Sequence, residues 1–184
     1  MTIDQFKYCP TCREPLVSRT HGGAERAACP DPACGFVHWG NPIPVVAAIV
    51  ERDNDVILVR SHGWPETWYG LVAGFLETAE RPEDAVLREV EEELGIRGIL
   101  GECVGVYPFE RMNQIIFTYH VLGHDGDIKL CDEELADYRQ VSIETVQPWS
   151  QGTGPALRDW LASRGYHPAV IEFGSVPNNQ PADS

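Results

Sequence analysis

One segment, residues 74–96, constrains the fold most because it specifies a helix with a defined start and a defined end. Pro82 suits the first turn of a helix, where its missing N–H has no partner to lose, and Gly95 is a natural stop. Between them, apolar residues recur at helical spacing and form a stripe that packs against another element. The stripe consists of Val86, Leu87, Val90 and Leu94. The segment therefore predicts a helix over residues 82–94, with Arg81 as a poor N-cap.

The same helix carries three carboxylates side by side. Glu89, Glu92 and Glu93 are related as i, i+3 and i+4, so their like charges destabilise the helix unless cations lie between them. Hard oxygen ligands suit Mg²⁺ or Mn²⁺, and Mg²⁺ is commonly shared between carboxylates and substrate phosphates. Taken alone, such a cluster is more often a solvated acidic face. The residues around the cluster indicate whether it is a metal site or a solvated acidic face.

That pattern resembles the Nudix box, Gly-x5-Glu-x7-Arg-Glu-U-x-Glu-Glu-x-Gly-U, in which U is a bulky apolar residue. All nine specified positions match within 23 residues, which makes the resemblance highly specific. The matching residues are Gly74, Glu80, Arg88, Glu89, Val90, Glu92, Glu93, Gly95 and Ile96. The resemblance implies an α+β fold, the Nudix α/β/α sandwich around a mixed sheet.

The resemblance also implies roles for individual residues. The implied catalytic residues are Arg88, Glu89, Glu92 and Glu93, with Arg88 orienting carboxylates rather than touching substrate. The three glutamates and the Gly74 carbonyl would hold Mg²⁺ or Mn²⁺, and a glutamate on a later loop, Glu133 or Glu134, would complete the site. Glu80 would support the motif. The general base would be Glu92, Glu93 or a residue outside the box.

The implied activity is metal-dependent hydrolysis of the pyrophosphate bond in a nucleoside diphosphate derivative. Bound cations would neutralise and align the diphosphate and lower the pKa of the attacking water. The substrates considered are FAD, ADP-ribose and NAD(H), each giving AMP and a second monophosphate. Two alternatives are a non-catalytic, nucleotide-sensing Nudix regulator and an NAD-cap RNA hydrolase.

Four cysteines near the N-terminus form a second motif. Cys9 and Cys12 stand as Cys-x2-Cys, and Cys29 and Cys34 as Cys-x4-Cys, the layout of a four-thiolate zinc site. A module of about 30 residues needs such a structural metal site because it buries too little apolar surface to fold alone. Two disulfides are the alternative, and His21 and His38 are reserve ligands. Zinc-ribbon modules precede some Nudix domains, so we expect a structural zinc ribbon over residues 1–40.

Further strands are expected around the helix, because apolar runs of strand length alternate with turn residues. They cover residues 45–50, 56–59, 101–107, 114–122 and 138–143, and residues 68–76 form a loop or strand. A second helix is predicted over residues 154–164, with Leu157, Trp160 and Leu161 at helical spacing. The Nudix hydrolase domain would then span residues 41–172. Residues 173–184, rich in proline and asparagine, would form a disordered tail.

Aromatic residues suggest where a substrate ring could stack. Tyr107, Phe109, Trp68 and Tyr69 are the candidates, although aromatics near strands are more often core residues. Arg111 could contact a phosphate. NADH pyrophosphatases carry Ser-Gln-Pro-Trp-Pro-Phe-Pro after the box, and this chain keeps only Pro-Phe there, at residues 108–109. The region around the second cysteine pair looks more like the FAD and ADP-ribose group.

The net charge and the distribution of apolar residues restrict which partners and which location we expect. A formal net charge of −14 argues against sequence-independent binding of nucleic acid, apart from a role on NAD-capped RNA. Residues 1–40 hold four basic and four acidic residues, so we expect the ribbon to extend the domain or to build a homodimer interface. No apolar stretch reaches the roughly 18 residues of a membrane span, and the first seven residues lack a secretory apolar run. We therefore expect a soluble, cytoplasmic protein.

Overall fold

The computed structural model describes residues 7–124 and 126–172, so the predicted tail at 173–184 lies outside it. These residues form two compact units. One contains residues 7–42 and 111–113, and the other contains residues 43–110 and 114–172. In the described part of the chain, no helix combines the length and the apolar character needed to cross a membrane.

The N-terminal unit is built on a hairpin of β1 (Val17–His21) and β2 (Ala24–Ala28). The strands pair antiparallel through a two-residue turn, Gly22 and Gly23, whose φ angles of 59° and 81° suit glycine. The hairpin leads directly into the second cysteine pair. A small β hairpin beside two cysteine turns is compatible with the predicted zinc ribbon.

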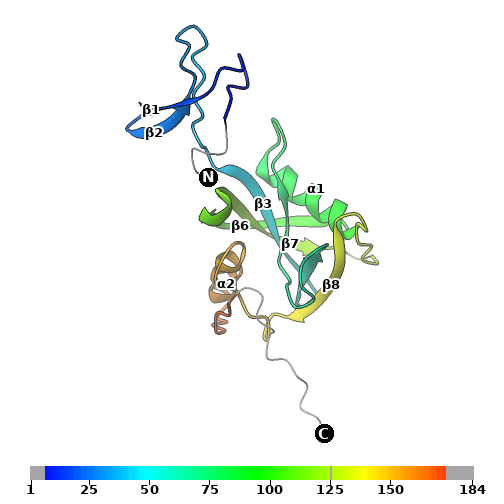
Figure 1. The fold of residues 1–184 in the computed structure, drawn as a ribbon. Helices are drawn as coiled ribbons and strands as arrows, with labels where there is room; N and C mark the ends of the chain where they lie inside the picture. Colours follow the sequence, from blue (N-terminus) through cyan, green and yellow to red (C-terminus); the bar gives the residue numbers. More distant parts are fainter. Residues whose placement is uncertain (1–6, 125, 173–184) are drawn as a thin grey trace. The chain divides into compact units, whose positions relative to one another are not determined.

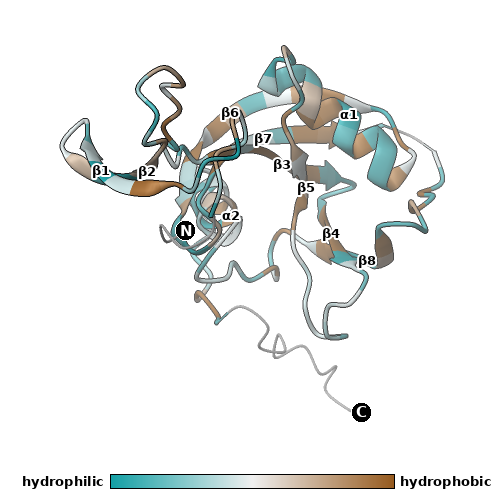
Figure 2. Cartoon of the chain, turned by 45° about the horizontal axis from the view of Figure 1, so that its top comes forward, coloured by the Kyte–Doolittle hydropathy of each residue, from teal (hydrophilic) through white to brown (hydrophobic). Residues whose placement is uncertain are grey.

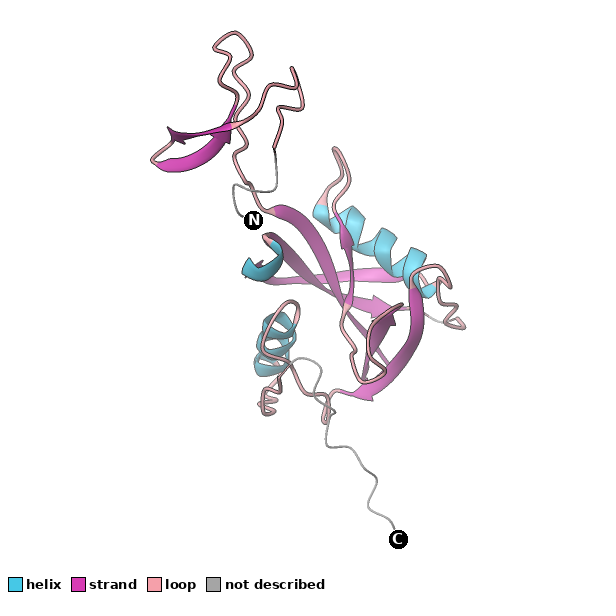
Figure 3. Ribbon diagram, viewed as in Figure 1, coloured by secondary structure: helices cyan, strands magenta, loops and turns pink. Residues whose placement is uncertain are grey.

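The larger unit is organised around a six-stranded sheet (Figures 1 and 3). Its strands are β3 (Ile43–Arg52), β4 (Asp55–Ser61), β5 (Val72–Phe75), β6 (Gly98–Phe109), β7 (Gln114–Gly123) and β8 (Leu135–Ser142). The main order is β6-β7-β3-β4-β8, and β5 pairs with β3 beside the start of that strand. β3 runs parallel to β7, whereas every other pair is antiparallel. The predicted mixed sheet is confirmed.

Helix α1 (Pro82–Leu94) covers one face of the sheet, with the bounds that the sequence predicted. Pro82 opens the helix without a side-chain cap at Arg81, and Gly95 ends it at φ 65°. Val86, Val90 and Leu94 of its apolar stripe are buried, Leu87 is partly buried, and the stripe packs against alternate residues of β3, including Val46 and Val50. In Figure 2 the ribbon of α1 alternates between hydrophobic and hydrophilic colours, as expected for a helix with one buried side.

Helix α2 (Gly154–Ser163) covers the opposite face. Leu157, Trp160 and Leu161 are buried and pack against residues such as Ile49, which alternates with the β3 residues beneath α1. Figure 1 shows the two helices on opposite sides of the sheet. The α/β/α sandwich is therefore confirmed, and residues 45–50 of its central strand β3 are buried on both faces of the sheet.

Candidate active site

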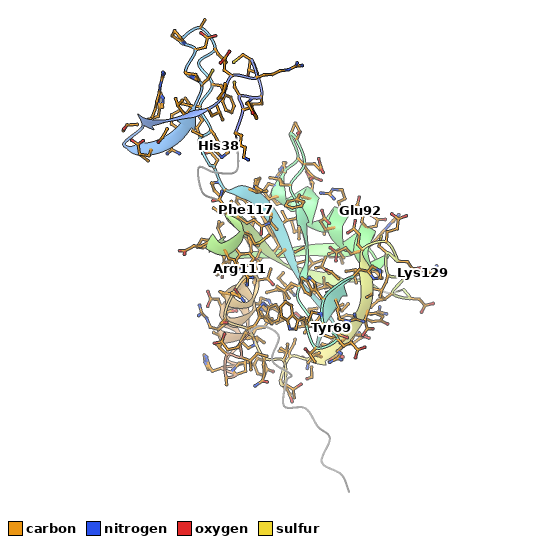
Figure 4. All side chains as sticks on the ribbon, in the orientation of Figure 1. His38, Tyr69, Glu92, Arg111, Phe117 and Lys129 are labelled. Atoms are coloured by element: carbon orange, nitrogen blue, oxygen red, sulfur yellow. The ribbon has the colours of Figure 1, made fainter. Side chains whose placement is uncertain are left out.

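The three glutamates of α1 differ in exposure. Glu89 and Glu93 are buried, with 8% and 5% of their surface exposed, whereas Glu92 faces solvent on the outer side of the helix (Figure 4). Carboxylates are rarely buried to this extent without a cation or a hydrogen-bonding partner. The interpretation as a solvated acidic face therefore does not hold for Glu89 and Glu93.

Arg88 bridges the carboxylates. Its Nε and Nη2 donate to the two oxygens of Glu80 at 2.8 and 3.0 Å. Its Nη1 donates to Glu89 at 2.8 Å and to Glu92 at 2.9 Å, and Nη2 also donates to the Phe75 carbonyl at 3.1 Å. These bonds use all five guanidinium donors and raise the pKa of Arg88, chiefly through Glu80. Arg88 is thus a permanently charged group that holds carboxylates in position.

Gly74 brings the backbone of β5 against the helix. A Cβ atom at this position would lie 2.0 Å from the carboxyl carbon of Glu89. The register Val46↔Gly74 fixes β5 on β3, so the strand cannot easily move away. The close approach requires glycine, because any side chain would displace Glu89.

Glu93 is the most buried carboxylate of the group. It accepts a hydrogen bond from the Ala73 N–H, but its Oε2 atom is buried with no hydrogen-bond partner among the described residues. Burial, together with the neighbouring charge of Glu89, raises the pKa of Glu93 to about 8. Burial also raises the pKa of Glu89, although Arg88 opposes that shift. In both residues the desolvation of the carboxylate outweighs the groups that favour its charged form.

The loop before β8 is attached to the end of α1 and brings in a further carboxylate. The Cys131 N–H donates to the Glu93 carbonyl at 3.0 Å. The His62 N–H donates to the Glu134 carbonyl at 3.0 Å, and His62 Nε2 lies 2.9 Å from the Asp132 carbonyl. Besides burial, the charge of Glu134 helps to raise the pKa of Glu93. This electrostatic coupling favours Glu134 over Glu133 as the additional carboxylate.

The arrangement fits a divalent cation. It offers hard oxygen ligands from α1, a backbone approach at Gly74 and a buried carboxylate oxygen with no partner of its own. Mg²⁺ is usually bound by one or two carboxylates and shared with substrate phosphates, so Glu89 and Glu93 could hold it against an anionic substrate.

The metal-free protein should lose stability as the pH rises from about 5 to about 8.5, because protons are held more tightly by the folded state. The pKa of Glu93 is about 8 when folded, above its ordinary value of 4.5, so its contribution is complete below about 4.5 and lost as the pH rises through about 8. Thermal denaturation followed by circular dichroism measures this. Glu93→Gln is the matched control, since its melting temperature should lack this component. Parallel pH profiles for the two proteins would contradict the prediction.

Gly74→Ala should weaken metal binding. The new methyl group would displace the Glu89 carboxylate from Arg88, so we expect the Mg²⁺ concentration for half-maximal turnover to rise at least about tenfold. Gly70→Ala is a suitable control, since its Cβ would meet the Trp64 ring at an ordinary 3.4 Å. Metal titrations of turnover compare the two variants. An unchanged metal requirement in Gly74→Ala would mean that Glu89 need not occupy its present position.

Two of the predicted substrate-contacting residues lie on the other face of the sheet. The Tyr107 hydroxyl donates to Asp159 of α2 at 3.1 Å, and burial raises the pKa of Tyr107 to about 12. Phe109 packs against Val45 and Ile116, which do not face α1. The structure therefore does not bring Tyr107 and Phe109 together with the carboxylates of α1.

The remaining predicted residues have different environments. Tyr69 is buried, its hydroxyl donates to Asp137, and the Arg139 guanidinium lies 4.1 Å from its ring centroid. Trp68 is partly buried in the loop before β5. Arg111 is exposed in the 3-10 helix Glu110–Met112, between β6 and β7. Figure 4 labels Tyr69 and Arg111.

The four N-terminal cysteines come together as one cluster. Their sulfur atoms all lie within 4.8 Å of one another, and the cluster consists of Cys9, Cys12, Cys29 and Cys34. The sulfurs of Cys9 and Cys34 are 3.6 Å apart and those of Cys12 and Cys29 are 3.4 Å apart, too far for the S–S bond of about 2.05 Å. All described cysteines are free thiols, and neither His21 nor His38 belongs to the cluster. The cluster could bind zinc.

The pKa values of the clustered thiols are shifted in opposite directions. Burial disfavours the Cys9 thiolate, but backbone N–H groups of Cys12 and Thr11 outweigh it and lower the pKa of Cys9 to about 6. The pKa of Cys12 rises instead to about 12, because neighbouring sulfurs and burial outweigh the N–H of Glu14. Four thiolates this close repel one another unless a cation neutralises them.

Sequence reasoning missed the groups that hold the loop before β8. His62 and Asp132 are 70 positions apart, and no spacing pattern relates them. The backbone N–H of Ala73 on Glu93 is equally invisible, because every residue other than proline offers such a group.

A family model and a solved structure both match most of the chain. The family model described as the NUDIX domain matches residues 41–161. The crystal structure of a NUDIX hydrolase from Nitrosomonas europaea is similar with a TM-score of 0.72 and 25% identity, over 91% of this chain and 97% of that one.

Curated relatives resemble the chain in sequence. The NAD-capped RNA hydrolase NudC of Stutzerimonas stutzeri is 27% identical over 144 residues, which cover 78% of this chain and 51% of the relative. The human NAD-capped RNA hydrolase NUDT12 is 28% identical over 149 residues, covering 77% of this chain and 32% of the relative. The chain thus spans about half the length of these relatives or less.

Proposed function

The chain belongs to the NUDIX family, and from that premise we propose that it hydrolyses the pyrophosphate bond of a nucleoside diphosphate derivative in a metal-dependent reaction. The substrates that we propose are FAD, ADP-ribose and NAD(H), each giving AMP and a second monophosphate. The proposal assigns to one site the residues Gly74, Arg88, Glu89, Glu92, Glu93 and Glu134.

One observation carries the proposal: buried Glu93 leaves Oε2 without a partner next to a second buried carboxylate, Glu89. An unpartnered buried polar atom destabilises the folded state by about 1–3 kcal/mol, and a cation held at Oε2 would remove that cost. Sites of this kind are typical of function, where local stability is given up for binding.

Each residue of the site has a distinct proposed role. Glu89, Glu92 and Glu93 would provide the oxygen ligands, and Glu134, on the loop before β8, would add a further carboxylate. Arg88 donates through Nη1 to both Glu89 and Glu92 and so orients the two carboxylates. Bound Mg²⁺ or Mn²⁺ would neutralise the diphosphate and lower the pKa of water. Glu92 or Glu93 would accept the proton of the attacking water, and Glu92 is the one exposed to solvent.

Residues outside the box would select the substrate. Trp68 stays a candidate for stacking on a base or a nicotinamide ring, and Arg111 for a phosphate. Tyr107 and Phe109 stay candidates only for a substrate part that reaches the α2 face of the sheet. We also propose zinc in the cysteine cluster, with a homodimer as a further prediction.

A second candidate function is removal of the NAD cap from RNA. It is supported by the names of the curated relatives, which are NAD-capped RNA hydrolases. The reacting bond is the same pyrophosphate bond, and only the group attached to it differs. An enzyme acting on capped RNA should therefore also act on NAD(H), unless RNA contacts provide most of the binding free energy.

A mass-spectrometric product assay tests the proposal. FAD, NADH, ADP-ribose, a nucleoside triphosphate and NAD-capped RNA are incubated with Mg²⁺ and separately with Mn²⁺. We expect AMP and the partner monophosphate from at least one dinucleotide, and no product with Glu92→Gln. Binding without turnover of any compound would instead identify a nucleotide-sensing Nudix domain. Turnover confined to the capped RNA would select the second candidate.

A further inference from the structure

The ribbon hairpin separates its charged side chains onto two faces. Arg19 and Arg26 are directly paired across β1 and β2. Because side chains alternate along a strand, they share a face with His21. Glu25 is on the other face, where the Ser18 hydroxyl donates to its carboxylate. One face of the hairpin is therefore basic and the other acidic.

An aromatic ring lies against the basic face. The guanidinium of Arg26 is 5.0 Å from the centroid of the Trp39 ring, a cation–π distance, and it also donates to the Trp39 carbonyl. The ring of His21 meets Trp39 edge-on at 6.4 Å. Trp39 is nevertheless 50% exposed. The indole is held by its neighbours but keeps an accessible surface.

The net charge of the ribbon, residues 1–40, differs from that of the whole chain. Residues 1–40 contain four basic and four acidic residues, so their net charge is 4 − 4 = 0 against −14 for the whole chain. The remaining residues therefore carry the entire excess of negative charge. Composition alone argued against nucleic-acid binding, but the hairpin concentrates two of the four ribbon cations on one face.

We propose that the ribbon basic face, formed by Arg19, His21, Arg26 and Trp39, binds single-stranded nucleic acid. A base would stack on Trp39, and the guanidinium groups of Arg19 and Arg26 would contact backbone phosphates. Each guanidinium is fixed by a backbone carbonyl, Arg19 by Pro30 at 3.3 Å and Arg26 by His21 at 3.1 Å.

Stacking distinguishes this ligand from an acidic peptide. Every base has a π-face that an exposed indole can stack on, whereas a peptide of acidic side chains has none. Fixed guanidinium planes also match the geometry of phosphate oxygens. The proposal does not depend on the hydrolase activity, since all four residues belong to the N-terminal unit.

Fluorescence anisotropy with the full-length, zinc-loaded protein tests the proposal. The probes are labelled oligouridine and oligodeoxythymidine of about eight nucleotides with a free 5′ hydroxyl, without added Mg²⁺, so that they offer no pyrophosphate to the other site. Two phosphate contacts predict a slope of about −1.4 in a plot of log K against log salt concentration. RNA and DNA should bind similarly unless the 2′ hydroxyl is read.

Single substitutions distinguish base stacking on Trp39 from phosphate contacts of the arginines. Trp39→Ala should weaken binding about tenfold, and Trp39→Phe should retain most of it. Arg19→Gln should reduce the magnitude of the salt slope by about 0.7. Glu25→Gln, on the opposite face, is the matched control and should stay within about twofold of the parent protein, since it removes no contact to the ligand. Zinc content measured for each variant shows that the ribbon is still folded.

Three results would overturn the proposal. They are no detectable binding by the parent protein, equal affinity of zinc-loaded Trp39→Ala and the parent, and equally effective competition by polyglutamate. The last would identify an acidic peptide as the ligand. If Trp39→Ala loses zinc, the test rests on Trp39→Phe and Arg19→Gln instead. Unchanged affinity and an unchanged salt slope in both variants would then show that this face is not a nucleic-acid site.

Discussion

Glu93→Gln is expected to lower turnover on the order of a thousandfold, within the range for loss of a group that acts on the attacking water. Glutamine has nearly the same shape but cannot supply a charged ligand at the position of Oε2. At the same time the metal-free variant should be more stable at pH 8 than the parent, because a buried ionisable group with a pKa of about 8 is replaced by a neutral one. Activity and stability should therefore change in opposite directions.

Steady-state kinetics with saturating Mg²⁺ and thermal denaturation without metal test this prediction together. A gain of 1 kcal/mol raises the melting temperature by roughly 2–4 °C for a protein of this size. Adding Mg²⁺ should raise the melting temperature of the parent but hardly that of the variant. Glu91→Gln is the matched control, since Glu91 is exposed on the same helix outside the carboxylate group. A variant with near-normal turnover would exclude Glu93 from the site.

With zinc bound in the cysteine cluster, as we propose, its removal should unfold the N-terminal unit. Structural zinc in zinc-finger peptides contributes about 10–16 kcal/mol of apparent binding free energy, far more than a hairpin of this size gains from burying apolar residues. Cys12→Ser should lose the metal and the amide-exchange protection of β1 and β2. The amides of α1 and the central sheet should keep theirs, because that unit has its own core.

Hydrogen exchange followed by mass spectrometry, with zinc content measured by atomic emission, provides the readout. Cys103→Ser is the control, since Cys103 is exposed on β6 and lies outside the cluster. One zinc per chain is expected in this control and in the parent protein. A zinc-free Cys12→Ser protein with protected β1 and β2 amides would show that the hairpin folds without the metal.

The sequence by itself determined the features that depend on local periodicity and on residue chemistry. Pro82, Gly95 and the apolar stripe between them specify helix α1 because each acts within one or two turns. Strands β3 and β7 were recognisable for the same reason, as apolar runs of strand length. The cysteine spacing likewise indicated a cluster, since each pair occupies one tight turn.

Only the tertiary structure decided which distant groups meet. Strand pairing places Gly74 against Glu89, and the bonds of His62 hold the loop that carries Glu134, although nothing in the spacing of these residues relates them. Burial was equally hidden: adjacent Glu92 and Glu93 look alike in sequence, yet one faces solvent and the other lacks a partner in the interior. Side-chain environment depends on the packing of the whole sheet, whereas periodicity reports one element at a time.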